Sequence, residues 1–159
     1  MRSGFLAGLL VVNPALTQEV APQPVAFSHR LHSEKAGLGC DFCHVEAAKG
    51  DAATLPSVDL CLTCHRVIKA DSGEVVKLVA AAEKGERIQC VPVYRVPDYV
   101  FFGHSPHVKA GLECASCHGP VATRDVLQRE ISTSMAACLD CHRKRGAPQS
   151  CVACHQLGH

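Results

Sequence analysis

The stretch Cys114-Ala115-Ser116-Cys117-His118 places a histidine directly after two cysteines that are separated by two residues. The same Cys-x-x-Cys-His spacing occurs five times in 159 residues, at Cys40 to His44, Cys61 to His65, Cys114 to His118, Cys138 to His142 and Cys151 to His155. This motif attaches haem c: both thiols add to the vinyl groups as thioethers, and the histidine ligates the iron. Zinc sites, redox dithiols and disulfides use Cys-x-x-Cys without requiring that histidine. We therefore predict five covalently bound haem c groups.

Each predicted haem has two attachment cysteines and one proximal iron ligand. The cysteines are Cys40, Cys43, Cys61, Cys64, Cys114, Cys117, Cys138, Cys141, Cys151 and Cys154. The proximal ligands are His44, His65, His118, His142 and His155. The other five histidines match the number of irons and are the expected distal ligands: His29, His32, His104, His107 and His159. Two imidazoles on each iron leave no open position, which favours electron transfer, so we expect no catalytic residue.

The distal ligands have alternatives. Any spare histidine can instead be a surface or hydrogen-bonded residue, and His159 lacks the paired context that the other four share. Met135 is the other candidate, because a thioether can replace imidazole on haem iron. Packing beside Cys138 is the commoner role of such a methionine. If Met135 ligates an iron, we expect His159 to be free.

Four of the five spare histidines belong to an internal repeat. Phe27-Ser28-His29-Arg30-Leu31-His32 precedes the first motif, and Phe102-Gly103-His104-Ser105-Pro106-His107 precedes the third. Each copy continues with a short spacer, a haem motif, a longer spacer and a second motif. Histidines three residues apart lie on one side of a helical turn but diverge enough to reach two irons. Each pair is therefore expected to tie two haems together.

The repeat divides the chain into four segments. We expect a signal-like or anchoring segment at 1–24, a first two-haem module at 25–68, a helix and an extended connector at 69–98, and a second module with three haems at 99–159. A capping pattern at 71–74 precedes apolar residues at helical spacing, which predicts a helix over about 73–84. Two prolines favour extended chain over 88–102, and a short helix is expected over 126–135.

The composition agrees with haems in place of a conventional core. Aromatic residues make up 4% of the chain, tryptophan is absent, and 11 cysteines raise the hydrophobic fraction to 47%. Five macrocycles for 159 residues predict short α-helices and irregular loops wrapped around the haems, with little β structure. The net charge of +1, without a basic run or interleaved aromatic residues, indicates no nucleic-acid binding.

Haem attachment also predicts the location. Haem c is attached outside the cytoplasmic membrane, so we expect an extracytoplasmic protein, periplasmic or on the outer face of that membrane. Arg2 and the apolar run 5–12 resemble a minimal signal peptide, but Asn13-Pro14 follows closely and there is no clean Ala-x-Ala site. The run is shorter than the roughly 20 residues of a membrane span. A cleaved signal and a retained anchor are both open.

The repeat and the stretches around it resemble a known family. The Phe-x-His-x-x-His element is similar to class III multihaem cytochromes, and the stretches Val93 to His104, Cys114 to Val121 and Met135 to Arg143 resemble the pentahaem subunit of alternative complex III and related quinone reductase complexes. The resemblance implies two class III-like repeats in a periplasm-facing subunit. Its implied partners are iron–sulfur or membrane quinone-reactive subunits and other cytochromes. The chain departs from the family at Cys90, where a tryptophan is usual.

The resemblance also implies how ligands and haems pair. It supports His29, His32, His104 and His107 as distal ligands, with His29 serving the first motif and His104 the third. His32 and His107 then reach other haems. We expect a bis-histidine, non-catalytic electron relay in a respiratory or quinone-linked complex, with membrane association through the complex or the N-terminus.

Two other functions remain as alternatives. One is a subunit of an extracellular cytochrome filament, in which a terminal histidine such as His159 ligates iron in the next subunit. The other is a multihaem reductase with one open haem, against which the equal number of irons and spare histidines argues.

Overall fold

The computed structural model describes residue 20 and residues 22–155. In that part, the chain forms short helices joined by loops. The elements are η1 (Leu31–Lys35), α1 (Cys40–Cys43), α2 (Val58–His65), α3 (Gly73–Glu83), α4 (His104–Lys109), α5 (Ala115–His118), η2 (Val121–Thr123), α6 (Met135–Arg145) and η3 (Cys151–Ala153). The β structure of the described residues is one isolated bridge between Val100 and His155. The expected small helical fold with little β structure is confirmed.

Serine residues determine where the three longest helices begin. The side chains of Ser57, Ser72 and Ser134 precede α2, α3 and α6, and each accepts a hydrogen bond from a backbone N–H in the first turn, at 3.2 to 3.3 Å. These bonds satisfy amide donors that have no partner within the helix. Gly146 ends α6 in the left-handed conformation, with φ of 64°, which glycine adopts at little cost.

The serine N-caps explain the outcomes of the two helix predictions. The helix expected over about 73–84 is confirmed as α3. The helix expected over 126–135 is wrong, because the chain from 126 to 134 is irregular and α6 begins only at Met135, after its serine cap. The capping serine therefore predicts the start of this helix better than the apolar residues that precede it.

The buried apolar side chains gather in one place. Leu62 of α2 is 1% exposed, and Val75, Leu78 and Ala81 of α3 are 4%, 9% and 7% exposed. These four are the buried hydrophobic residues of the described part, and they belong to α2 and α3, which pack against each other. Elsewhere the chain is loop-rich and its large apolar side chains are exposed, as expected where haem macrocycles supply the apolar partner surface.

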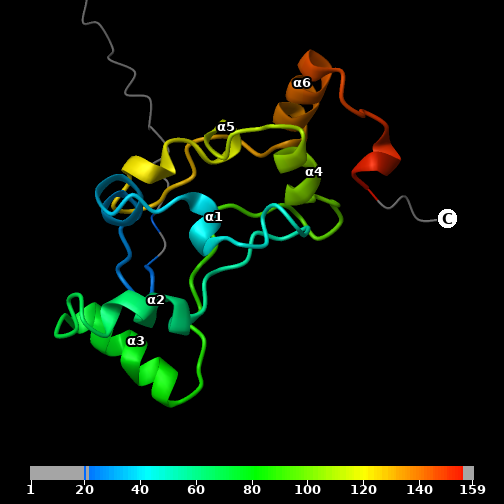
Figure 1. Ribbon diagram of the computed structural model, residues 1–159. Helices are drawn as coiled ribbons and strands as arrows, with labels where there is room; N and C mark the ends of the chain where they lie inside the picture. The colour runs from blue at the N-terminus through cyan, green and yellow to red at the C-terminus, as the bar shows by residue number, and fades with distance from the viewer. Residues whose placement is uncertain (1–19, 21, 156–159) are drawn as a thin grey trace, which may run out of the picture.

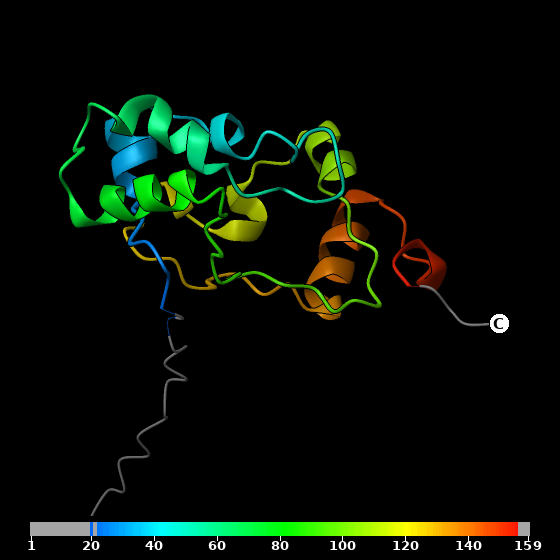
Figure 2. The ribbon, with the colours of Figure 1, turned by 90° about the horizontal axis from the view of Figure 1, so that it is seen from below.

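The helices are spread along an elongated molecule. Figure 1 shows the α2–α3 hairpin at one end, α1 and α5 in the middle, and α6 and η3 toward the other end. Figure 2, turned by 90°, shows the same separation of the hairpin from η3. Segments from the two halves of the sequence also meet where η1 packs against η2. The five motifs are thus distributed along the molecule and not gathered around one point.

Candidate haem sites

We number the candidate sites by their motifs along the chain. Site 1 is Cys40 to His44, site 2 is Cys61 to His65, site 3 is Cys114 to His118, site 4 is Cys138 to His142, and site 5 is Cys151 to His155. The motif residues lie on or directly beside short helical segments: α1, α2, α5, α6 and η3. A helical turn brings two cysteines three positions apart onto the same side, next to the histidine that follows.

The two copies of the repeat adopt the same geometry. In the first, the ring of Phe27 stacks on His32, with centroids 4.2 Å apart and planes at 24°, and meets His29 edge-on at 4.8 Å and 85°. In the second, Phe102 stacks on the later histidine at 4.8 Å and 29° and meets the earlier one edge-on at 4.9 Å and 84°. The phenylalanine therefore fixes the directions of both imidazoles, which is why it recurs in both copies.

Seven histidines donate their Nδ1 proton to a backbone carbonyl oxygen. The donor–acceptor distances are 2.5 to 3.2 Å. The seven bonds run from His32 to Ser28, from His44 to Thr54, from His65 to Ile68, from His104 to Asp51, from His107 to Gly103, from His142 to Pro148 and from His155 to Tyr99. A carbonyl oxygen only accepts, so Nδ1 carries the proton and Nε2 keeps its lone pair. A second-shell bond of this kind orients an imidazole that ligates a metal through its other nitrogen.

Three pairs of imidazoles face one another. The ring centroids lie 5.9 Å apart for His32 and His65, 6.2 Å for His104 and His118, and 6.1 Å for His107 and His142. Each pair joins one repeat histidine to one motif histidine. When one metal ion lies between two imidazoles, each metal–nitrogen bond is about 2 Å long and each nitrogen lies about 1 Å from its ring centroid, so the two centroids are about 6 Å apart. The donor sets therefore fit one iron between the two rings of each pair.

His29 is half-buried near site 1. Its partial burial, together with the nearby His44 and His32, lowers the pKa of His29 to about 4. Its Nδ1 atom is buried without a hydrogen-bond partner. His29 is therefore a neutral imidazole at neutral pH, which is the form that ligates a metal. It lies close enough to His44, the motif histidine of site 1, for the two imidazoles to interact electrostatically.

Site 5 is the least complete in the described residues. His155 is held by its bond to Tyr99, by its bridge to Val100 and by the 2.7 Å hydrogen bond from the Phe101 amide to the carbonyl of Cys154. The expected distal ligand, His159, lies outside the described residues. The alternative ligand, Met135, begins α6 and is 62% exposed.

Tyr94 braces the proximal ligand of site 3. Its hydroxyl donates to the carbonyl of His118 at 3.1 Å and accepts from the amides of Glu130 and Ile131 at 3.1 and 3.4 Å. The ring meets the imidazole of His118 edge-on, with centroids 4.7 Å apart and planes at 79°. Burial lowers the pKa of His118, and His104 and His44 lower it further. Tyr94 lies in a stretch that resembles the family, but nothing in the residue pattern predicted this role.

Tyr94→Phe should lower the free energy of unfolding by about 1–2 kcal/mol, because it leaves two backbone amides and one carbonyl without their partner. Denaturant unfolding of the haem-loaded protein, followed by its Soret absorption, measures the change. Tyr99→Phe is the matched control: Tyr99 is 69% exposed, and we expect its variant to change stability by less than about 0.5 kcal/mol. Equal losses in both variants would contradict the bracing role.

Asp125 braces the turn that carries His29. Its carboxylate accepts a hydrogen bond from the Ser28 hydroxyl at 2.6 Å and pairs with the guanidinium of Arg30 at 2.8 Å. The Ser28 hydrogen bond, followed by the Arg30 bond, lowers the pKa of Asp125. The Arg30 amide also donates to the carbonyl of Arg124 at 3.0 Å. Residues from the second half of the chain thus form hydrogen bonds with both neighbours of His29, and no sequence motif predicted this arrangement.

The cysteines do not pair with one another. No disulfide joins any two of the eleven cysteines, all of which lie in the described residues, and Cys90, the one outside the motifs, is half-buried. Burial raises the pKa of the Cys90 thiol, so it stays protonated and unreactive at neutral pH.

In the part of the chain that the structure describes, we find no helix with the length and apolar character needed to cross a bilayer.

Two family models together cover the motifs. Residues 10–96 match the class III cytochrome c family, and residues 100–156 match cytochrome c7 and related cytochromes c. The chain is also 33% identical, over 122 residues, to the menaquinone reductase multiheme cytochrome c subunit of Nitratidesulfovibrio vulgaris strain Hildenborough. That alignment covers 72% of this chain and 57% of the relative, so the chain spans little more than half of the relative's length. The chain belongs to the class III cytochrome c family and is a multihaem electron-transfer protein with covalently bound haem c.

Proposed function

We propose that this protein carries five haem c groups and relays electrons, without catalysis of its own, inside an extracytoplasmic quinone-linked complex. The observation that carries the proposal is the set of three facing imidazole pairs, each about as wide as a six-coordinate iron requires. The Nδ1 bonds of the motif and repeat histidines add support, because they leave Nε2 free for the metal.

The proposal assigns two axial ligands to each site. The pairs are His44 with His29 at site 1, His65 with His32 at site 2, His118 with His104 at site 3, His142 with His107 at site 4, and His155 with His159 at site 5. Met135 is the alternative to His159. The ten motif cysteines form the thioether bonds, and Cys90 takes no part.

The chain's residues perform three tasks in such a relay. The backbone carbonyls that accept from Nδ1 hold each ring in one tautomer and one orientation. The repeat histidines would hold the iron as second imidazole ligands and would so keep substrates away from the metal. The stacked phenylalanines hold two imidazoles in fixed directions through one turn of chain, so ligation changes little between oxidation states. When bound, haem c supplies an iron that accepts and releases single electrons.

The partners in this proposal are other redox proteins. The relative from Nitratidesulfovibrio vulgaris is a subunit of a menaquinone reductase, and multihaem c-type cytochromes work outside the cytoplasmic membrane. We place this protein in the same compartment, between an iron–sulfur or quinone-reactive membrane subunit and another cytochrome. Membrane association then comes from the complex or from the N-terminal segment.

Haem count and spin state test the proposal. Mass spectrometry of the purified holoprotein should show five haems on each chain, and low-temperature electron paramagnetic resonance of the ferric protein should show low-spin iron only. A high-spin ferric signal in the native protein would indicate an open haem and favour the reductase alternative. Polymers that dissociate on dilution, seen by light scattering, would favour the filament. Fewer than five haems would refute the pentahaem assignment directly.

A further inference from the structure

We propose that electrons pass through the five sites in the order 2, 1, 3, 4, 5, so that sites 2 and 5 are the two ends of the relay. This order differs from the order of the motifs along the chain, in which site 2 would stand between sites 1 and 3. The inference rests on the proposed function, and it comes from the contacts that join neighbouring sites.

One turn of chain joins sites 2 and 1. His32 faces His65 of site 2 at 5.9 Å, while His29, three residues earlier, lies beside His44 of site 1. The ring of Phe27 contacts both repeat histidines and fixes their separation. The two sites are therefore held as neighbours by residues of the first repeat.

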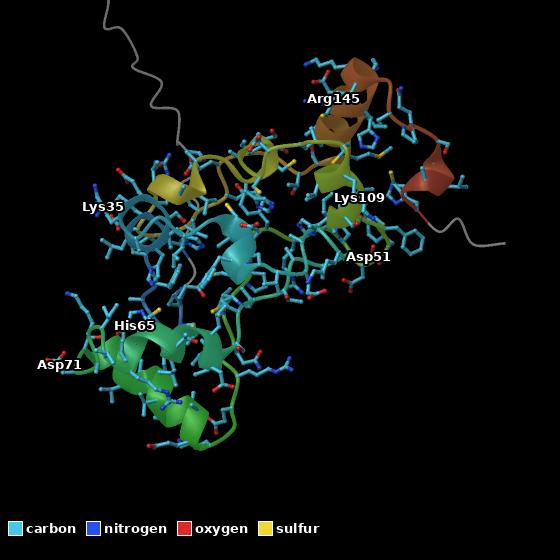
Figure 3. All side chains as sticks on the ribbon, in the orientation of Figure 1. Lys35, Asp51, His65, Asp71, Lys109 and Arg145 are labelled. Atoms are coloured by element: carbon cyan, nitrogen blue, oxygen red, sulfur yellow. The ribbon has the colours of Figure 1, made fainter. Side chains whose placement is uncertain are left out.

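The loop that follows motif 1 joins sites 1 and 3. The carbonyl of Asp51 accepts hydrogen bonds from the amide and Nδ1 of His104, at 3.1 and 2.9 Å, and the carbonyl of Gly50 accepts from the Ser105 amide at 3.0 Å. A Cβ atom at Gly103 would lie 2.9 Å from a carboxylate oxygen of Asp51, so the two segments approach each other closely at this point. Figure 3 shows Asp51 near the helix that ends at Lys109, far from His65.

Helix α4 joins sites 3 and 4 as the first repeat joins sites 2 and 1. His104 faces His118 of site 3 at 6.2 Å, and His107 of the same turn faces His142 of site 4 at 6.1 Å. The planes of the first pair are almost parallel, at 6°, and those of the second are at 44°. The second repeat therefore places site 4 next to site 3.

Site 5 is attached beyond site 4. The chain that leaves α6 passes Pro148, whose carbonyl accepts from Nδ1 of His142, and enters motif 5 directly. The contacts of Val100 and Phe101 with His155 and Cys154 tie motif 5 to the strand-like segment just before α4. Figures 1 and 2 both place η3 at the opposite end of the molecule from α2.

Polar surface residues lie near both proposed ends. Asp71, six residues after the proximal ligand of site 2, and Gln149, two residues before motif 5, are both exposed, and Figure 3 shows Asp71 at the hairpin end of the molecule. These two residues are matched attachment points for a photoreductant outside the haem motifs. Each can be replaced by cysteine in a Cys90→Ala background and labelled with a ruthenium polypyridyl complex.

The test injects electrons at either end and times their arrival at site 4. A His107→Met substitution serves as the reporter, because a thioether ligand raises the potential of site 4 and makes it the electron sink. Removing the site 1 haem with Cys40→Ala and Cys43→Ala should slow arrival from position 71 at least tenfold and leave arrival from position 149 unchanged. In the motif order, electrons from site 2 would bypass site 1, and unchanged arrival from position 71 would overturn the proposal.

A second variant keeps all five haems if the first does not mature. His29→Met should raise the potential of site 1, so that electrons injected at position 71 are held there and arrive late at site 4, while arrival from position 149 is unaffected. An arrival time from position 71 that His29→Met leaves unchanged would overturn the order. The haem count and spin state of the unlabelled protein test the proposed function separately, so the two failures are distinguishable.

Discussion

Replacing His107 with methionine should raise the reduction potential of one haem, at site 4, by on the order of 0.1 V. His107 faces His142 with centroids 6.1 Å apart, and its Nδ1 is held by the carbonyl of Gly103 at 2.7 Å. A thioether stabilises ferrous iron relative to imidazole, so reduction becomes easier. The other four potentials should change much less, because their ligands are unaltered. Spectroelectrochemical titration of the holoprotein resolves the five steps.

His104→Met is the matched control for this prediction. His104 lies on the same turn of α4 but faces His118, so its replacement should shift the potential of site 3. The two sites are distinguishable by electron paramagnetic resonance, because the imidazole planes are at 6° in one and 44° in the other. A His107→Met variant whose altered signal belonged to the haem of Cys114 and Cys117 would contradict the ligand pairing.

Leu62→Ala should lower the free energy of unfolding by about 2–5 kcal/mol, the usual cost of a cavity at a buried leucine. Leu62 is 1% exposed and lies in α2, which packs against α3, and the buried residues of α3 make up the rest of the apolar core in the described chain. Denaturant unfolding at constant haem content, followed by circular dichroism and by the Soret band, measures the loss.

Val76→Ala provides the control on the outer face of α3. Val76 is 54% exposed, and its truncation should cost less than about 0.5 kcal/mol. If Leu62→Ala were as mild as this control, the hairpin contact would not stabilise the fold, and the haem attachments alone would hold that end of the molecule together.

Local chemistry explains which features were predictable. Cys-x-x-Cys-His depends on residues within one turn, so the motif predicts covalent haem without knowledge of the fold. The spacing of His104 and His107 likewise predicts that one turn serves two sites, and the structure finds both rings paired with motif histidines. The helix over 73–84 was predictable because Ser72 and the apolar residues of one face act locally.

Long-range contacts explain what the residue pattern missed. Tyr94 reaches His118 and the amides at 130 and 131, and Asp125 reaches Ser28 across 97 positions. Neither residue belongs to a motif, since hydrogen bonds between distant segments depend on how the loops pass one another. The prediction of a helix over 126–135 is wrong for a similar reason. In that stretch the backbone amide of Glu130 donates a hydrogen bond to the Tyr94 hydroxyl, and the Glu130 carboxylate pairs with Arg124, so the chain makes these contacts in place of a helical turn.

The sequence by itself determined the kind of protein: five attachment motifs, a duplicated histidine pair and too few aromatic residues for an ordinary core specify a small helical chain built around haem c. The tertiary structure alone decided which imidazoles face one another. The physical reason is distance along the chain. Attachment is complete within five residues, whereas His32 and His65, or His107 and His142, meet only because the intervening loops fold back and backbone carbonyls hold each ring in place.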